Sequence, residues 1–161
     1  DSPIIRYAEV LLNYAEAMYE LGTTGKALDD ALNISLNLVR LRVNPDMPKL
    51  TTSFVSENNL NMREEIRRER TIELYNEGFR IDDLKRWNTA IVEMPKPILG
   101  VKWTGTDFAT SWAGASNMAK DSDGCLILEN SRRWGSKNDL YPLPVDQCQL
   151  NPNLGQNPGW Q

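Results

Sequence analysis

The residues best suited to bind a ligand are aromatic and lie in the polar stretch that follows Pro97. Trp103, Trp112 and Trp134 stand among Gly, Ser, Thr, Asn and Asp rather than on a periodic helix face, so regular core burial does not explain them. The flat face of an indole stacks on the C–H face of a sugar ring, and polar neighbours bond the hydroxyl groups. We therefore predict a carbohydrate-binding loop surface, although each tryptophan could instead anchor a loop to the body of the fold. The predicted ligand-binding residues are Trp103, Trp112 and Trp134 as stacking platforms, with Asp107, Asn117 and Lys120 as hydroxyl partners.

A charged block at residues 62–87 offers acid and base groups. Its candidates for a glycosidase pair are Glu73, Glu77, Asp82 and Asp83, and such a pair must face one cleft at roughly 5 to 9 Å. The block also contains as many basic as acidic residues. Hydrogen bonds from arginine keep a carboxylate ionised, which opposes the protonated state that a general acid needs. We therefore interpret the block as salt-bridged helices and predict no catalytic residue.

The composition excludes several classes of function. Histidine is absent, which removes the commonest general base at neutral pH and the commonest imidazole metal ligand. Lys and Arg total 18 against 22 Asp and Glu, for a net charge of −4, and no stretch is strongly basic. Nucleic acid is therefore not an expected partner. No apolar run approaches the ~18 residues of a membrane span.

The sequence predicts neither a metal site nor a cofactor. The run at residues 121–124, Asp-Ser-Asp-Gly, has the types of a calcium loop, but an EF-hand with this glycine sixth would begin at Ala119 and end at Asn130. Neither is the residue required there, so we interpret the run as a tight turn. Cys125 and Cys148 are too few for a zinc cluster, although they could pair in an oxidising compartment.

Hydrophobic periodicity predicts a mostly helical chain, and its 161 residues fit one compact unit. The predicted helices span residues 4–21, 26–42, 57–77 and 81–92, and residues 125–129 form the one predicted strand. The short connection at residues 22–25 makes the first two helices an antiparallel hairpin, with spacing similar to a tetratricopeptide unit. The predicted fold is all-α, with tetratricopeptide-like helical hairpins and a long irregular loop region at residues 95–139.

Three groups of motifs, in order along nearly the whole chain, resemble a known family. The first is RYAEVLL at residues 6–12 with YAEA at 14–17. The second is ERTIEL at 69–74 with EGFR at 77–80 and DLKRW at 83–87, and the third is LYPLP at 140–144 with QNPGW at 156–160. This ordered set is similar to the C-terminal portion of the SusD/RagB family of outer-membrane nutrient-binding lipoproteins. The motifs belong to the scaffold and specify no ligand residues.

The resemblance implies a non-catalytic protein that captures oligosaccharide, polysaccharide or peptide nutrient for a TonB-dependent transporter of the SusC type. It implies that residues 1–161 are the C-terminal helical domain of a longer lipoprotein, exposed at the cell outer membrane. The parent would contact the membrane only through a lipid anchor on an N-terminal part that is missing here. Two other functions stay open: a tetratricopeptide-type scaffold that binds protein, which leaves the aromatic loops unexplained, and a carboxylate-pair glycosidase.

Overall fold

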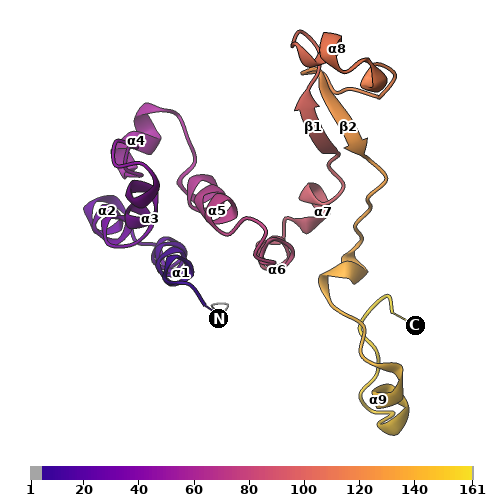
Figure 1. Ribbon diagram of the computed structural model, residues 1–161. Coiled ribbons are helices and arrows are strands. Elements are labelled where there is room, and N and C mark those ends of the chain that lie inside the picture. Colours follow the sequence, from indigo (N-terminus) through magenta and orange to yellow (C-terminus); the bar gives the residue numbers. More distant parts are fainter. Residues whose placement is uncertain (1–4, 161) are drawn as a thin grey trace. The chain divides into compact units, whose positions relative to one another are not determined.

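The computed structural model describes residues 5–160, apart from the side chain of Ala113, and it divides into two compact units. The first unit ends at Arg80 and the second begins at Ile81. Helices dominate the described residues, which contain two short strands besides (Figure 1). The predicted, mostly helical fold is therefore confirmed.

The first unit is helical throughout its regular elements. Its helices are α1 (Tyr7–Glu20), α2 (Gly25–Asn33), α3 (Leu36–Val43), α4 (Thr52–Glu57) and α5 (Met62–Glu73). α1 packs against α2, α3 and α5. It does so because Ala8, Leu12 and Ala15 recur at intervals of four and three on one face and are all buried. Residues 1–4, which the sequence assigns partly to this helix, lie outside the described residues.

The single helix predicted at residues 26–42 is interrupted in the structure. α2 and α3 meet at Ser35, whose φ and ψ of −136° and −100° are not helical. The buried Ser35 hydroxyl donates to the carbonyl of Ala31 at 2.6 Å, a local bond that competes with helix continuation. The interruption leaves Leu32 and Leu36 both fully buried.

The helix predicted at residues 57–77 is also shorter than expected. α5 begins after Asn61, whose side chain accepts a hydrogen bond from the backbone of Glu64 at 3.2 Å. The preceding helix, α4, ends at Glu57, and Asn59 follows with a left-handed φ of 52°. The reason is local, because asparagine tolerates this backbone and caps a helix better than it continues one.

The core of the first unit joins residues from its helices and the segments between them. It comprises Ala8, Leu12, Ala15, Leu28, Leu32, Leu36, Val39, Leu50, Met62, Ile66 and Leu74. Several polar side chains are buried beside it, among them Asn37 and Arg40. Asn37 donates to the carbonyl of Leu50 at 3.0 Å and accepts from its N–H at 2.7 Å, which holds the segment before α4 in place. Arg40 pairs with Glu69 at 2.7 Å, with both side chains mostly buried.

The second unit mixes short helices with a two-stranded sheet. It contains α6 (Arg80–Arg86, whose first residue closes the first unit), α7 (Ala90–Glu93), β1 (Ile98–Lys102), α8 (Phe108–Ser111), β2 (Cys125–Glu129) and α9 (Val145–Leu150). Two 3-10 turns occupy Ala113–Ala115 and Ser136–Asp139. The helix predicted at residues 81–92 is divided at Asn88, which has a left-handed φ of 55°. The strand predicted at residues 125–129 is confirmed.

The region predicted as irregular, residues 95–139, contains a strand that the sequence did not reveal. β1 pairs antiparallel with β2, with Leu99 opposite Ile127 (Figure 1). Gly100 lies beneath the side chain of Leu128, and a Cβ on it would stand 3.2 Å from the Leu128 Cδ2 atom. Because glycine is depleted in strands, local sequence argues against β1, and the cross-strand contact is what stabilises it.

Both cysteines, Cys125 and Cys148, are free thiols in the structure, so the pairing that the sequence left open does not occur in it. The Cys148 thiol donates instead to the carbonyl of Gly155 at 3.1 Å. Within residues 5–160, the structure contains no helix with both the length and the apolar character needed to span a membrane.

Candidate functional site

Two of the three predicted stacking tryptophans lie together in the second unit. The ring centroids of Trp103 and Trp112 are 6.3 Å apart, and the ring planes are inclined at 56°. Trp103 is 5% exposed and packs with Ala115 and Leu126 in a small core, whereas Trp112 is 57% exposed. The Trp112 ring is therefore accessible to solvent, and Trp103 contacts it from the core side.

The backbone around the hairpin positions this tryptophan pair. The N–H of Trp103, directly after β1, donates to the carbonyl of Gly124 at 2.8 Å. Gly124 has a φ of 81°, and a Cβ on it would lie 2.5 Å from the Cβ of Thr104, so only glycine fits. Trp112 directly follows α8, and its N–H donates to the carbonyl of Phe108 at 2.9 Å. The pair is thus set by the end of a strand and the end of a helix.

The three polar residues predicted as hydroxyl partners differ in their surroundings. The Lys120 Nζ atom lies 5.8 Å from the Trp103 ring centroid and donates to two loop carbonyls at 2.9 and 2.8 Å. One of its three N–H groups is left for a ligand. Asp107 is exposed at the start of α8, and Asn117 is exposed in the loop after the 3-10 turn. The structure therefore brings Lys120 to the tryptophan pair and leaves Asp107 and Asn117 accessible nearby in sequence.

Trp134, the third predicted platform, makes a separate set of contacts. Its indole N–H donates to the Oδ1 atom of Asp139 at 2.9 Å. The Nζ atom of Lys85, on α6, lies 5.8 Å from its ring centroid. The ring is half-buried. The three tryptophans therefore form one pair and one separate ring rather than a single predicted surface.

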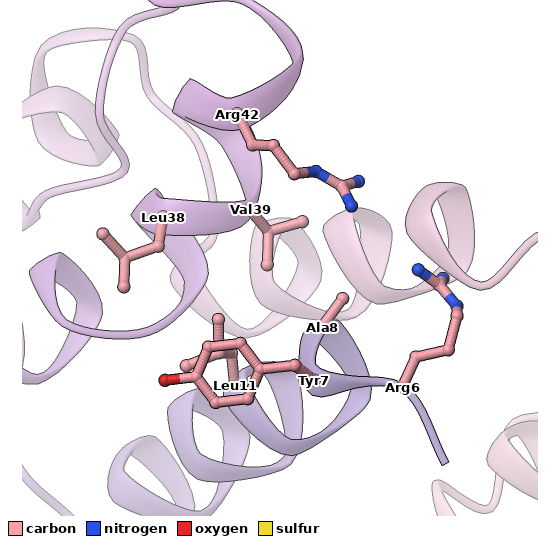
Figure 2. A pocket seen from close by; sticks show the side chains of 7 residues that line it. All are labelled: Arg6, Tyr7, Ala8, Leu11, Leu38, Val39 and Arg42. Carbon is pink, nitrogen blue, oxygen red and sulfur yellow. The ribbon is translucent and has the colours of Figure 1, made fainter. Parts of the chain in front are cut away.

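A pocket of about 320 Å³ opens in the first unit between α1 and α3. Figure 2 shows its lining side chains, which are Arg6, Tyr7, Ala8, Leu11, Leu38, Val39 and Arg42. The helix patterns predict Tyr7 and Leu38 as inward residues, and both are exposed in the structure. The reason is that the apolar stripe of each helix is wider than the surface its neighbours cover. Sequence periodicity placed both residues on the inward faces of their helices and therefore did not predict that they line a pocket.

The two arginines at the pocket share the carboxylate of Glu73, the last residue of α5, and Arg6 also pairs with Glu77 beyond that helix. Arg6 pairs with Glu73 at 3.0 Å and with Glu77 at 2.6 Å, and Arg42 pairs with Glu73 at 2.9 Å. Hydrogen bonds to Glu77 and then Glu73 raise the pKa of Arg6, and the bond from Arg6 lowers the pKa of Glu77. This rim of the pocket is therefore ionised and internally paired.

We expect the first unit to lose stability in acid partly through Glu77. The pKa of this carboxyl is lower in the folded chain than its ordinary value of 4.5, so its pairing stabilises the fold above pH 4.5. That contribution disappears as the pH falls through the folded pKa. Urea unfolding between about pH 7 and pH 3 should show a smaller acid loss for Glu77→Gln than for the wild type. The same pH dependence in both proteins would contradict this role.

The four carboxylates considered as a glycosidase pair have other surroundings in the structure. Glu73 and Glu77 are held by arginines, and the buried Asp83 pairs with Arg86 at 2.8 Å. Asp82 is exposed on α6. These ion pairs are those expected of salt-bridged helices, and attraction to a guanidinium favours the ionised carboxylate over the acid.

The run at residues 121–124 forms the turn that its sequence predicts. The Oδ1 atom of Asp121 accepts from the backbone N–H groups of Asp123 at 3.0 Å and Cys125 at 2.8 Å. This carboxylate therefore closes the turn that leads into β2. No cluster of three or more His, Cys, Asp or Glu side chains suited to a metal ion occurs in the part of the chain that the structure describes.

Comparison with known proteins identifies the family. A sequence model of the SusD family matches residues 1–160. The chain belongs to the SusD family. Two solved structures from Bacteroides fragilis are similar to this SusD-family chain. One, a SusD-like carbohydrate binding protein, is 31% identical over 96% of the chain with a TM-score of 0.71. The other, a SusD-like protein, is 29% identical over 98% of the chain with a TM-score of 0.66.

The SusD-family match confirms the resemblance inferred from the three motif groups. The chain spans about a quarter of the length of its solved relatives, with 28% of the first and 25% of the second covered. A search of the curated proteins found no match to it.

Proposed function

We propose that this SusD-family chain belongs to a protein that captures oligosaccharide or polysaccharide at the cell surface, without cleaving it, and delivers it to a TonB-dependent transporter of the SusC type. The observation that carries the proposal is the exposed ring of Trp112, supported from the core side by Trp103. A flat, accessible aromatic ring, whose neighbour Trp103 is contacted by Lys120, suits a sugar ring and its hydroxyls. The solved carbohydrate-binding relative supports this choice of ligand.

Capture would use a surface that is formed before the sugar arrives. Because Trp112 already contacts Trp103, its ring would lose little conformational freedom on stacking. Lys120, Asp107 and Asn117 would then bond hydroxyl groups around the stacked ring. Contacts of this kind are individually weak, which suits a protein that must release its ligand unchanged.

Delivery to a transporter places the parent protein at the outer face of the outer membrane. In this proposal it is a surface-exposed lipoprotein, and a lipid on an N-terminal part outside this sequence anchors it. Membership of the SusD family supports that location. The hydrogen bond from Arg6, which lowers the pKa of Glu77, supports capture rather than catalysis, because an acid–base mechanism needs one protonated carboxyl.

Replacing Trp112 by alanine should weaken oligosaccharide binding roughly tenfold or more, because the stacking surface is removed. Calorimetry against a panel of plant, host and microbial oligosaccharides measures the affinity. Trp112→Phe is the matched variant, and it should keep part of the affinity because a smaller ring remains. Full affinity in Trp112→Ala would place the sugar elsewhere on the chain. If the wild type binds no oligosaccharide of the panel, the proposal is overturned.

The pocket between α1 and α3 favours a second function, a tetratricopeptide-type scaffold that binds protein. Its apolar lining, with Tyr7 and Leu38 exposed at the surface, suits an apolar side chain of a partner helix. Arg42, which is 58% exposed, could meet a carboxylate of the same partner. The two functions use different units of the chain, so the Trp112 variants test one without altering the other.

A further inference from the structure

The second unit carries a group of cations next to exposed aromatic rings. Between residues 130 and 141 the chain has three basic residues and one acidic residue, although acidic residues outnumber basic ones over its whole length. Lys85, on α6, joins this segment through its contacts with two aromatic rings. We call the group the cationic aromatic surface, and it consists of Lys85, Arg132, Arg133, Trp134, Lys137 and Tyr141.

The cations of this surface are bonded to carbonyls and rings rather than to carboxylates. Arg133 donates to the carbonyls of Asn130 and Arg132, and Arg132 donates to the carbonyl of Lys96. Within the described residues, none of the four cations has a carboxylate oxygen in ion-pair range. Backbone carbonyls orient a guanidinium without neutralising its charge. Arg132 also interacts electrostatically with Glu129, so the charges that remain available to an anion are those of Lys85, Arg133 and Lys137.

The first unit shows what arginines in this chain do when their role is structural. Arg6, Arg40, Arg42 and Arg63 each pair with a glutamate at 3.0 Å or less. The cations of the cationic aromatic surface make no such ion pair, and in this they differ from the arginines of the first unit. Apart from the electrostatic interaction of Arg132 with Glu129, no carboxylate of the described residues pairs with these cations, which favours a ligand that supplies one.

The aromatic rings of this surface are placed to contact a sugar beside its charge. Tyr141 is 68% exposed, and the Nζ atom of Lys85 lies 3.6 Å from its ring centroid. The same Nζ atom is 5.8 Å from the centroid of Trp134, whose orientation is fixed by its bond to Asp139. One ammonium group thus contacts two aromatic rings, and its N–H groups make no hydrogen bond within the described residues.

We propose that the cationic aromatic surface binds anionic glycan, meaning sugar rings that bear a carboxylate or a sulfate. The anionic group accepts hydrogen bonds from Lys85 and Arg133, while the ring that carries it lies against Trp134 or Tyr141. This inference rests on the proposed function and adds a substrate class to it, because a neutral sugar offers no charged partner to Lys85, Arg133 and Lys137.

The test compares sugars that differ only in charge. Calorimetry would titrate the chain with a galacturonic acid tetramer, with its methyl-esterified counterpart, and with a chondroitin sulfate tetramer before and after desulfation. We expect the galacturonic acid tetramer to bind at least ~10-fold more tightly than its uncharged ester. The chondroitin sulfate tetramer should bind more tightly than its desulfated form, which keeps only the glucuronate carboxylates, and both advantages should shrink at high salt. The pair that shows the larger advantage identifies carboxylate or sulfate as the preferred anion.

Two variants assign the effect to this surface. Lys85→Met and Arg133→Met remove charge while keeping a long side chain, and each should remove most of the advantage of the charged sugar. Lys26→Met is the matched control, because it removes one exposed cation from the first unit. Near-ultraviolet circular dichroism checks that Lys85→Met retains the packing of its neighbouring rings.

The outcomes separate this inference from the proposed function. Equal affinity for charged and uncharged sugars would overturn the inference while the capture of glycan stands. A charge preference that persists in Lys85→Met and Arg133→Met would overturn the assignment to this surface. If the chain binds none of these sugars and none of the oligosaccharides of the earlier panel, the proposed function itself is overturned.

Discussion

Replacing Arg40 by methionine is expected to lower the free energy of unfolding of the first unit by about 2–4 kcal/mol. The Nη1 atom of Arg40 pairs with Glu69 at 2.7 Å, and its Nε atom donates to the carbonyl of Pro48 at 3.1 Å. Methionine fills much of the same volume but leaves the mostly buried Glu69 carboxylate without its cation. Urea unfolding followed by far-ultraviolet circular dichroism measures the loss.

A double variant separates lost pairing from lost packing. Arg40→Met with Glu69→Leu removes both charges and should recover most of the stability, because a buried ion pair contributes little net free energy. Arg63→Met is the surface control, since Arg63 pairs with Glu20 at 2.8 Å and both side chains are largely exposed. It should cost less than about 1 kcal/mol. Equal losses for the two arginine variants would show that burial of the Arg40 pair has no energetic consequence.

Replacing Trp103 by alanine is expected to destabilise the second unit by about 3–5 kcal/mol. The ring is 5% exposed and forms a small core with Ala115 and Leu126, so its removal leaves a cavity that few neighbours can fill. It also removes the contact that positions Trp112. Near-ultraviolet circular dichroism and urea unfolding should both report the loss, and sugar binding should fall with them.

The Trp103→Ala and Trp112→Ala proteins should therefore lose sugar binding for different reasons. Trp112→Ala removes an exposed ring and should leave the free energy of unfolding within about 1 kcal/mol of the wild type. Trp103→Phe keeps an apolar ring in the core and should retain most of the stability that Trp103→Ala loses. A Trp103→Ala protein with wild-type stability but no sugar binding would make Trp103 a ligand contact rather than a core residue.

Local pattern was sufficient for the mostly helical class of the chain and for its family, although three of the four predicted helices are interrupted or shorter in the structure. The apolar periodicity of residues 4–21 predicted a helix and included Ala8 and Ala15, which are both buried, but it also included Tyr7, which is exposed, and it passed over Leu12, which is fully buried. The charged block at residues 62–87 forms the ion pairs that its balance of charge predicts. The motif groups from RYAEVLL to QNPGW predicted the SusD family correctly. Each of these features involves residues close together in the sequence, so the local sequence is enough to predict it.

Contacts between distant residues settle the rest. The antiparallel partner β2 stabilises β1 despite the central Gly100 of β1, and the local sequence of β1 does not predict this pairing. Trp103 and Trp112 look alike in the sequence, yet Leu126 from the partner strand covers the first ring and leaves the second exposed. The exposed fraction of each ring depends on which distant segments pack against it, and that fraction decides which ring a sugar could contact. A periodic pattern along the chain does not specify these long-range contacts.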